Sequence, residues 1–292
     1  MPVRQLHQPR TMEEVFALLG EDPDAKIISG GTAVMLMLGQ GLIAPERLIS
    51  LRRLDIGQLH SWRGIDQDRH YVRIGGGVTL SEVAESPVIR EQFPSLAHAC
   101  AVVGNVRVRN VATLAGNMAE ADYASDPPSV LDSLSAECVT AGPGGERLLQ
   151  AGQFITTFYE NTLHHDEVLR EIRLPKPQAD RRTTYVKYIS RSSEDRPCVG
   201  VAAATRLRGG KVRALRVVVG AVAGTPQRCP EAALLLRGRS PTTAAIAECA
   251  QAHAESIEAM DDQRGSRWYR SRMIEVNVRR ALHEVFAREE VR

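Results

Sequence analysis

The sequence lacks the features of a membrane-spanning or exported protein. None of its 292 residues fall in an uninterrupted apolar run approaching the roughly 18 residues of a membrane span, and the first residues contain no apolar signal-peptide core. The net charge is only +2, with acidic and basic residues interleaved along the chain. No charged surface for nucleic acid or an anionic membrane is therefore expected, and the expected location is the cytoplasm.

Metal-binding and catalytic patterns are also missing. The five cysteines are scattered without a C-x-x-C pair, so we expect small buried hydrophobic side chains and no metal site in this chain. The neighbours His164 and His165 have no H-E-x-x-H spacing and are expected in a surface loop. No Ser-His-Asp, Cys-His or paired-carboxylate arrangement is evident, so no catalytic residue is predicted. The cysteines are Cys100, Cys138, Cys198, Cys229 and Cys249.

The common nucleotide-binding patterns, G-x-G-x-x-G and the Walker loop, do not occur. Two other glycine-bearing loops follow apolar segments, Ser29-Gly30-Gly31-Thr32 and Thr113-Leu114-Ala115-Gly116-Asn117. Glycine lets backbone N–H groups approach phosphate oxygens closely, and Thr or Asn adds side-chain donors. Together the loops predict a pyrophosphate site on a fold other than Rossmann or P-loop. Either loop alone is first interpreted as a tight strand-to-helix connection, because Gly-Gly turns are common.

The rest of the chain predicts a globular protein of two or three domains with mixed helices and strands. Helices are expected over 11–19, with Thr11 opening a capping box and Gly20 as C-cap, and over 33–38, 81–84, 94–103, 129–134, from Pro241 onward and around 274–286. Strands are expected over 26–28, 48–51, 71–74, 183–190, 199–207 and 212–222, the last two joined as a hairpin at Gly209-Gly210. Residues 104–128 are expected to be a long, functional loop. Prolines near 174–177 mark a domain boundary.

The order of the motifs carries a family resemblance. After the lysine and first glycine loop come Gly75-Gly76-Gly77-Val78-Thr79-Leu80, then Gly104 to Asn110 leading into the second loop, then Ser125-Asp126-Pro127-Pro128, and finally Tyr269-Arg270-Ser271-Arg272 with Arg279 to Leu282. With this order, over essentially all of its length, the chain resembles the FAD-binding medium subunit of the molybdenum hydroxylases. That group includes xanthine dehydrogenase and aerobic carbon monoxide dehydrogenase.

The resemblance implies an α+β fold: a two-subdomain FAD-binding region of the vanillyl-alcohol-oxidase (PCMH) type, followed by an α+β C-terminal domain. The expected ranges are 1–55 for the N-terminal FAD-binding subdomain, 56–177 for the middle FAD-binding subdomain and 178–292 for the C-terminal flavoprotein domain. The flavin is expected between the first two and in contact with the third.

The resemblance also assigns cofactor-binding residues. Residues 26–33 would wrap the pyrophosphate from one side and residues 113–117 would hold it from the other. Asp126 would accept hydrogen bonds from the ribityl hydroxyls, Leu169 would pack on the nucleotide, and Lys187 would contact the cofactor from the C-terminal domain. The full implied set is Lys26, Ile27, Ile28, Ser29, Gly30, Gly31, Thr32, Ala33, Val103, Thr113, Leu114, Ala115, Gly116, Asn117, Ser125, Asp126, Leu169 and Lys187.

Several of these residues have a structural alternative. Asp126 could cap the helix that follows, Leu169 could belong to the core, and Lys187 could face outward from a strand. Arg107 and Arg109 are expected to support the loop. The chain also departs from the family pattern at Ala33, where a polar residue is common, and at Ala115, where glycine is usual; since alanine adds only a methyl group, FAD binding should survive.

By the resemblance, the chain is the FAD-binding subunit of a heterotrimeric molybdenum hydroxylase, expected as a dimer of heterotrimers. A large subunit with the molybdenum cofactor would hydroxylate the substrate, and a small subunit with two [2Fe–2S] clusters would pass electrons through FAD to an external acceptor. Two alternatives stay open: a free-standing FAD oxidoreductase similar to the cell-wall reductase of the UDP-sugar pathway, and a scaffold subunit that has lost its flavin. The branch similar to 4-hydroxybenzoyl-CoA reductase is disfavoured, since the cysteine-bearing insertion of that branch is missing.

Overall fold

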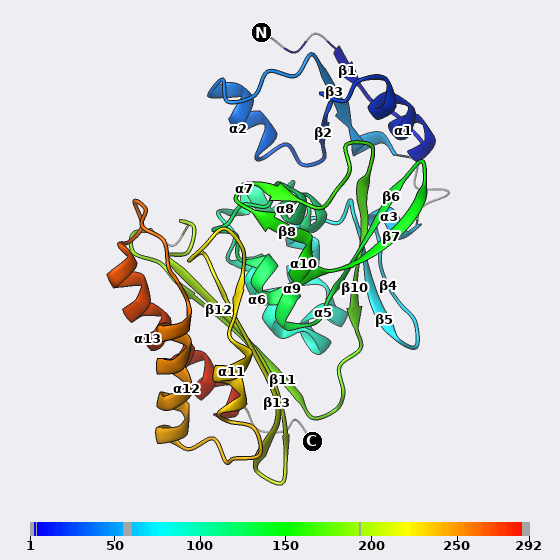
Figure 1. The fold of residues 1–292 in the computed structure, drawn as a ribbon. Helices are drawn as coiled ribbons and strands as arrows, with labels where there is room; N and C mark the ends of the chain where they lie inside the picture. Colours follow the sequence, from blue (N-terminus) through cyan, green and yellow to red (C-terminus); the bar gives the residue numbers. More distant parts are fainter. Residues whose placement is uncertain (1–2, 4, 55–59, 193, 288–292) are drawn as a thin grey trace.

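The structure is a computed structural model that describes residues 3, 5–54, 60–192 and 194–287. These residues form a mixed α+β fold, as predicted, in which sheets of three, five and four strands succeed one another along the chain (Figure 1). Within the described ranges, no helix is long and apolar enough to cross a membrane. The five cysteines are all buried, as expected of small hydrophobic side chains.

A parallel sheet in the order β1-β3-β2 forms the N-terminal part. Its strands and helices are β1 Gln5–His7, α1 Met12–Glu21, β2 Lys26–Ile28, α2 Val34–Gly39, β3 Arg47–Ser50 and the 3-10 turn η1 Leu51–Arg53. Thr11 caps α1 as predicted, accepting from the backbone N of Glu14 at 3.2 Å. Gly20 as C-cap is wrong: the helix continues through it to Glu21, and its C-cap is Asp22, which is extended because Pro23 follows.

The middle part contains the five-stranded antiparallel sheet β4-β5-β10-β6-β7. Its elements are α3 His60–Arg63, β4 Ile65–Gln67, β5 Tyr71–Gly75, α4 Leu80–Glu85, α5 Pro87–Gln92, α6 Pro94–Ala101, α7 Val106–Arg109, α8 Leu114–Glu120, α9 Pro127–Ser133, β6 Glu137–Gly142, β7 Gly145–Gln150, α10 Ala151–Phe154, β8 Ile155–Thr157, β9 Glu160–Asn161 and β10 Val168–Pro175. The helices and β10 share one core, which includes Leu80, Leu96 and Leu131.

The prediction of a long loop over 104–128 is wrong, because α7, α8 and the start of α9 lie within this range. Asn105 accepts from the backbone N of Arg107 and Val108, and Thr113 accepts from that of Gly116, so each short helix has a side-chain cap. The glycines and asparagines that indicated a loop are therefore helix caps and helix residues. Arg109 supports this segment, as predicted, by donating to the carbonyl oxygens of Val103 and Gly104.

The C-terminal part is an antiparallel sheet, β11-β12-β13-β14, with three helices on one face. The elements are β11 Arg181–Tyr188, β12 Val199–Arg208, β13 Lys211–Gly220, β14 Gln227–Arg228, α11 Pro230–Leu234, α12 Thr243–Ser256 and α13 Arg267–Ala287. The hairpin at Gly209-Gly210 is confirmed, with φ of 58° and 70°. Helix α12 begins later than predicted, because Thr242 is its cap and Pro241 precedes it. The opposite face of the sheet packs on α6 and α9 (Figure 1).

Candidate functional site

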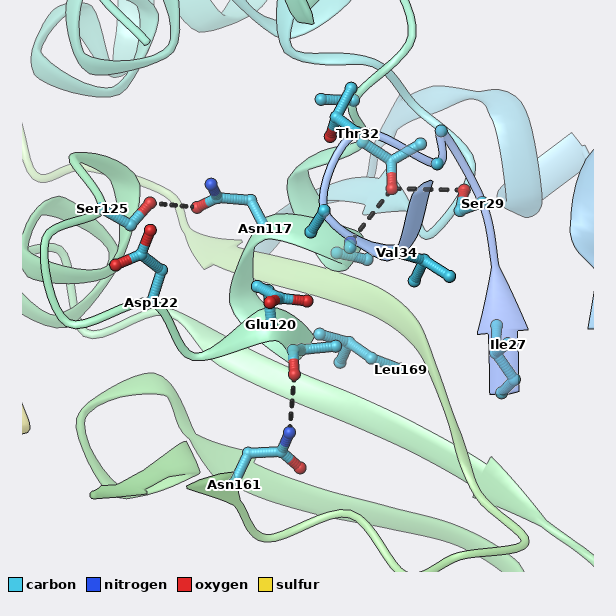
Figure 2. Close-up of a pocket in the computed structure, with 18 of the residues that line it drawn as sticks. Ile27, Ser29, Thr32, Val34, Asn117, Glu120, Asp122, Ser125, Asn161 and Leu169 are labelled. Carbon is cyan, nitrogen blue, oxygen red and sulfur yellow. Dashed lines mark hydrogen bonds between the residues drawn. The ribbon is translucent and has the colours of Figure 1, made fainter. Parts of the chain in front are cut away.

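A cavity of about 890 Å³ is lined by residues from all three parts of the chain (Figure 2). Its volume lies in the range of roughly 300–1,000 Å³ typical of ligand sites. The β2–α2 loop, helix α8 and the segment from Ser125 to Asp126 supply much of its wall, β10 contributes Leu169, and β11 contributes Lys187. The sequence therefore brings segments more than 150 residues apart to one concave surface.

The two glycine loops meet in this wall. The Thr113 hydroxyl donates to the Ser29 hydroxyl at 3.3 Å. A Cβ on Gly30 would lie 1.9 Å from the backbone oxygen of Val111, so only glycine allows this backbone contact. Gly31 has φ +78°, a left-handed conformation that side-chain-bearing residues avoid. The glycine at position 30 thus serves packing between the loops, and that at position 31 serves the turn itself.

Helix α8 presents polar groups beside these loops. Thr113 caps the helix through its hydroxyl, which accepts from the backbone N of Gly116 at 3.0 Å. The Asn117 amide oxygen accepts from the Ser125 hydroxyl at 2.7 Å, so the amide nitrogen is the donor left for a ligand. Ala115, one of the two departures from the family pattern, lines the cavity and is buried against the core of the middle part, where its methyl group is accommodated.

The predicted cofactor-binding residues line the cavity with two exceptions, Ile28 and Leu114. Ile27 and Ser29 line the cavity, while the side chain of Ile28 lies against Gly31. Leu114 is fully buried in the core of the middle part. The prediction that whole segments would line the site therefore included two side chains that serve packing.

Asp126 is the centre of a buried polar network. Its carboxylate accepts from the Tyr185 hydroxyl at 2.6 Å and from the Lys187 ammonium group at 3.1 Å, and Lys187 also donates to the carbonyl oxygen of Val102 at 2.8 Å. Burial raises the pKa of Asp126 to about 6, against the opposing effects of Lys187 and Tyr185. The same burial, together with the charge of Asp126, raises the pKa of Tyr185 well above its usual value.

The geometry decides between the cofactor-binding and structural interpretations of Asp126, Lys187 and Leu169. Asp126 stands at the start of α9 but makes no side-chain capping bond, so that alternative is wrong. Lys187 does not face outward, since its side chain is only 7% exposed and points toward Asp126. Leu169 is a core residue that also lines the cavity, so the two interpretations coincide there.

Other residues of the wall carried no recognised signal in the sequence. Glu167, just before β10, accepts from Arg147 Nε at 2.7 Å and from the backbone N of His164 at 2.9 Å, and the Arg147 hydrogen bonds lower the pKa of Glu167 to about 2. Asp122 pairs with Arg196 at 2.8 Å. His164 and His165 are exposed, as predicted for a surface loop, yet both line the cavity. Glu120 and Asp122 directly follow the second glycine loop, and only that proximity could have indicated them.

Comparison with known proteins agrees with this architecture. Residues 2–177 match the family model of the FAD binding domain in molybdopterin dehydrogenase, and residues 184–285 match that of the CO dehydrogenase flavoprotein C-terminal domain. The chain is 31% identical over 288 residues to the carbon monoxide dehydrogenase medium chain of Hydrogenophaga pseudoflava, with 98% of each chain covered. It is 27% identical over 289 residues to the nicotine 6-hydroxylase medium subunit of Paenarthrobacter nicotinovorans, with 99% of each covered.

The likeness extends to solved structures. One chain of carbon monoxide dehydrogenase from Hydrogenophaga pseudoflava superposes with a TM-score of 0.93 at 31% identity, covering 98% of this chain and 99% of that one. The protein therefore belongs to the family of FAD-binding medium subunits of the molybdenum-containing dehydrogenases, as the resemblance indicated.

Proposed function

We propose that this chain holds one FAD in the cavity and serves as the electron-transfer subunit of a molybdenum hydroxylase. In that role it accepts electrons from [2Fe–2S] clusters in a partner subunit and delivers them to an external acceptor. The observation that carries the proposal is the joined pair of glycine loops in the cavity wall, where Thr113 bonds Ser29 and Gly30 packs on the Val111 backbone. An anionic pyrophosphate needs such closely approaching backbone together with hydroxyl and amide donors.

The residues present fit FAD. The Ser29 to Ala33 loop and the Thr113 to Asn117 segment would bind the pyrophosphate, and Leu169 would pack on an apolar face of the nucleotide. Asp126 would accept from the ribityl hydroxyls: a carboxylate has about four acceptor sites, and Tyr185 and Lys187 use only part of them. When bound, FAD supplies the capacity to take up electrons and pass them to an outside acceptor, while the protein places it and tunes its potential.

Assembly with partner chains is supported by the surface around α2. Between Lys26 and Glu46 the sequence has no charged residue. In α2 only Val34 is buried, while Met35, Leu36 and the following Leu42 are 56%, 54% and 70% exposed. A helix that is apolar on all sides is normally covered, and exposed apolar patches of this kind typically mark protein interfaces. We therefore propose that α2 is covered when a large molybdenum-cofactor subunit and a small [2Fe–2S] subunit assemble with this chain.

The assembly is tested by the double substitution Met35→Glu and Leu42→Glu in the chain co-expressed with its neighbouring subunits, because both side chains are exposed and neither lines the cavity. We expect the tagged chain to lose its partners on size-exclusion chromatography while keeping its FAD. Trp268→Glu is the matched control, because Trp268 is 70% exposed on α13 and lies far from α2. Equal loss of partners in both variants would contradict a specific role of α2.

FAD binding is tested by absorbance of the purified chain, alone and co-expressed, with the released cofactor identified by chromatography. Gly30→Val should abolish the yellow colour, because its side chain would overlap the Val111 backbone. Gly20→Ala is the control, since nothing lies within 4 Å of the added methyl group. A Gly30→Val protein with full FAD would contradict the assigned site, and a colourless wild-type protein in both preparations would favour the scaffold alternative.

A further inference from the structure

Glu120 places a carboxyl group inside the cavity that has no hydrogen-bond partner among the described residues. It is the last residue of α8, and Figure 2 shows its side chain between the Ser29 to Val34 loop and Asn161. Within the part of the chain that the structure describes, no group donates a hydrogen bond to this carboxyl group. The other buried or half-buried carboxyl groups described above behave differently, since Asp126, Glu167 and Asp122 are each held by a cation.

The pKa of Glu120 depends on the charges of three neighbouring side chains, and a bound anionic ligand would change their effect. Burial raises the pKa of Glu120, Asp122 raises it further, and Lys26 and Arg196 lower it. Arg196 is already paired with Asp122 at 2.8 Å. Lys26, at the start of β2, is the remaining nearby cation, and it is also a residue assigned to the pyrophosphate.

The elements packed against α8 bring further titratable groups toward the cavity. Glu160 of β9 is exposed, Asp126 at the start of α9 is paired with Lys187, and Glu167 before β10 is paired with Arg147. His164 and His165 lie on the same rim. These groups are either neutralised by their own partners or open to solvent, whereas Glu120 is half-buried and faces the cavity.

We propose that Glu120 couples FAD binding in this cavity to pH: its neutral carboxyl group contacts the cofactor as a hydrogen-bond donor, and its carboxylate opposes binding. The phosphates and ring carbonyls of FAD offer only acceptors, and a carboxylate can only accept, so an ionised Glu120 cannot hydrogen-bond to them. The pyrophosphate also draws on Lys26, which removes the charge that best stabilises the ionised form of Glu120. FAD binding is therefore accompanied by proton uptake wherever Glu120 of the free protein is ionised, and FAD affinity falls as pH rises through that range.

This inference rests on the proposed function, and the experiment separates the two. FAD is released from the full chain and titrated back by quenching of flavin fluorescence at pH 6 and pH 8, for the wild type, Glu120→Gln and Glu160→Gln. The wild type should bind about five- to tenfold more weakly at pH 8, within the usual range of coupling between two binding events. Glu120→Gln, which is neutral and keeps a donor, should bind with equal affinity at both pH values.

Glu160→Gln is the matched control, since it makes the same chemical change on the exposed side of the same cavity. It should retain the pH dependence of the wild type. Unchanged pH dependence in Glu120→Gln, or its loss in Glu160→Gln as well, would overturn the role of Glu120 while leaving the FAD site intact. Failure of all three proteins to bind FAD at either pH would refute the site itself and this inference with it.

A second measurement requires no substitution. Calorimetric titration of the wild type with FAD at pH 7.5, in two buffers of different ionisation enthalpy, gives the number of protons taken up. Net uptake that disappears in Glu120→Gln supports the proposal, and proton release or no exchange in the wild type overturns it.

Discussion

Two buried carboxyl groups in the cavity wall, Asp126 and Glu167, have pKa values that are shifted in opposite directions. Burial dominates at Asp126 and raises its pKa to about 6, whereas the hydrogen bonds of Arg147 dominate at Glu167 and lower its pKa to about 2. The difference lies in the donors: Glu167 accepts from a guanidinium fork and a backbone N–H, while Asp126 accepts from a phenol and one ammonium group. The number and charge of the donors, and not burial alone, decide which form of a carboxyl group is stable.

The largest effect should come from Lys187→Met, which leaves Asp126 buried with only Tyr185 as a partner. We expect a loss of about 3–5 kcal/mol in the free energy of unfolding at pH 7.5, since removing one member of a buried pair strands the other charge. The loss should be smaller at pH 5, where Asp126 is protonated. Urea unfolding at both pH values checks this, with Lys211→Met on an exposed strand end as the control. An equal loss at both values would mean that packing, and not charge, is responsible.

Asp126→Asn should remove a pH dependence. The folded pKa of about 6 lies above the unperturbed value of 3.8, so the folded state binds the proton more tightly. The contribution of Asp126 to stability is therefore greatest at low pH and falls as pH rises from about 4 to about 6, by roughly 2–3 kcal/mol. The difference in unfolding free energy between wild type and variant should change by that amount between pH 4 and pH 7. A constant difference would show that the carboxyl group does not titrate in this range.

Glu167→Gln should have a smaller effect with the opposite sign of pH dependence. Because the folded pKa of about 2 lies below the unperturbed 4.5, the carboxylate stabilises the fold above pH 4.5 and loses that contribution as pH falls toward 2. We expect a cost of about 1–2 kcal/mol at pH 7, a value reduced because Arg147 is partly exposed to solvent. The difference in unfolding free energy between the wild type and Glu167→Gln should therefore be smaller at pH 3 than at pH 7. Divergence at low pH would contradict the assignment.

Arg196→Gln completes the series at the solvent-exposed edge of the cavity. Arg196 is 48% exposed, so its pair with Asp122 should contribute about 0–1 kcal/mol. Most of that contribution should disappear in about 1 M salt, where exposed charges are screened. Thermal or urea unfolding at low and high salt measures it. A loss above 2 kcal/mol that persists in high salt would show that this pair belongs with the buried ones.

Much of the fold follows from local sequence patterns. The apolar face of α13, with Ile274, Val278 and Leu282 buried, and the Gly209-Gly210 hairpin are where they were predicted. The helices within 104–128 were missed because a short helix has too few residues for apolar periodicity, so only its cap identifies it. The boundaries of α1 and α12 shifted by a few residues because Pro23 and Thr242 determine where these helices end and begin.

The candidate site also contains one part that the sequence predicted and another part that it did not. Its glycine loops are continuous in sequence and could be recognised from their own residues and their order. The network of Asp126, Tyr185 and Lys187 joins residues about 60 positions apart, and nothing in the local sequence of one indicates the others. The wall contributed by Glu120, Asn161 and His164 is of the same kind.

The sequence by itself thus determined which segments form helices and strands, where the two glycine loops lie and which family they indicate, because backbone conformation and capping depend on near neighbours. Only the tertiary structure decided that the loops touch through Gly30 and Val111, and that Asp126 is paired while Glu120 has no partner among the described residues. Burial and pairing depend on groups brought together from distant parts of the chain. The protonation of each carboxyl group in this cavity is therefore a property of the folded protein.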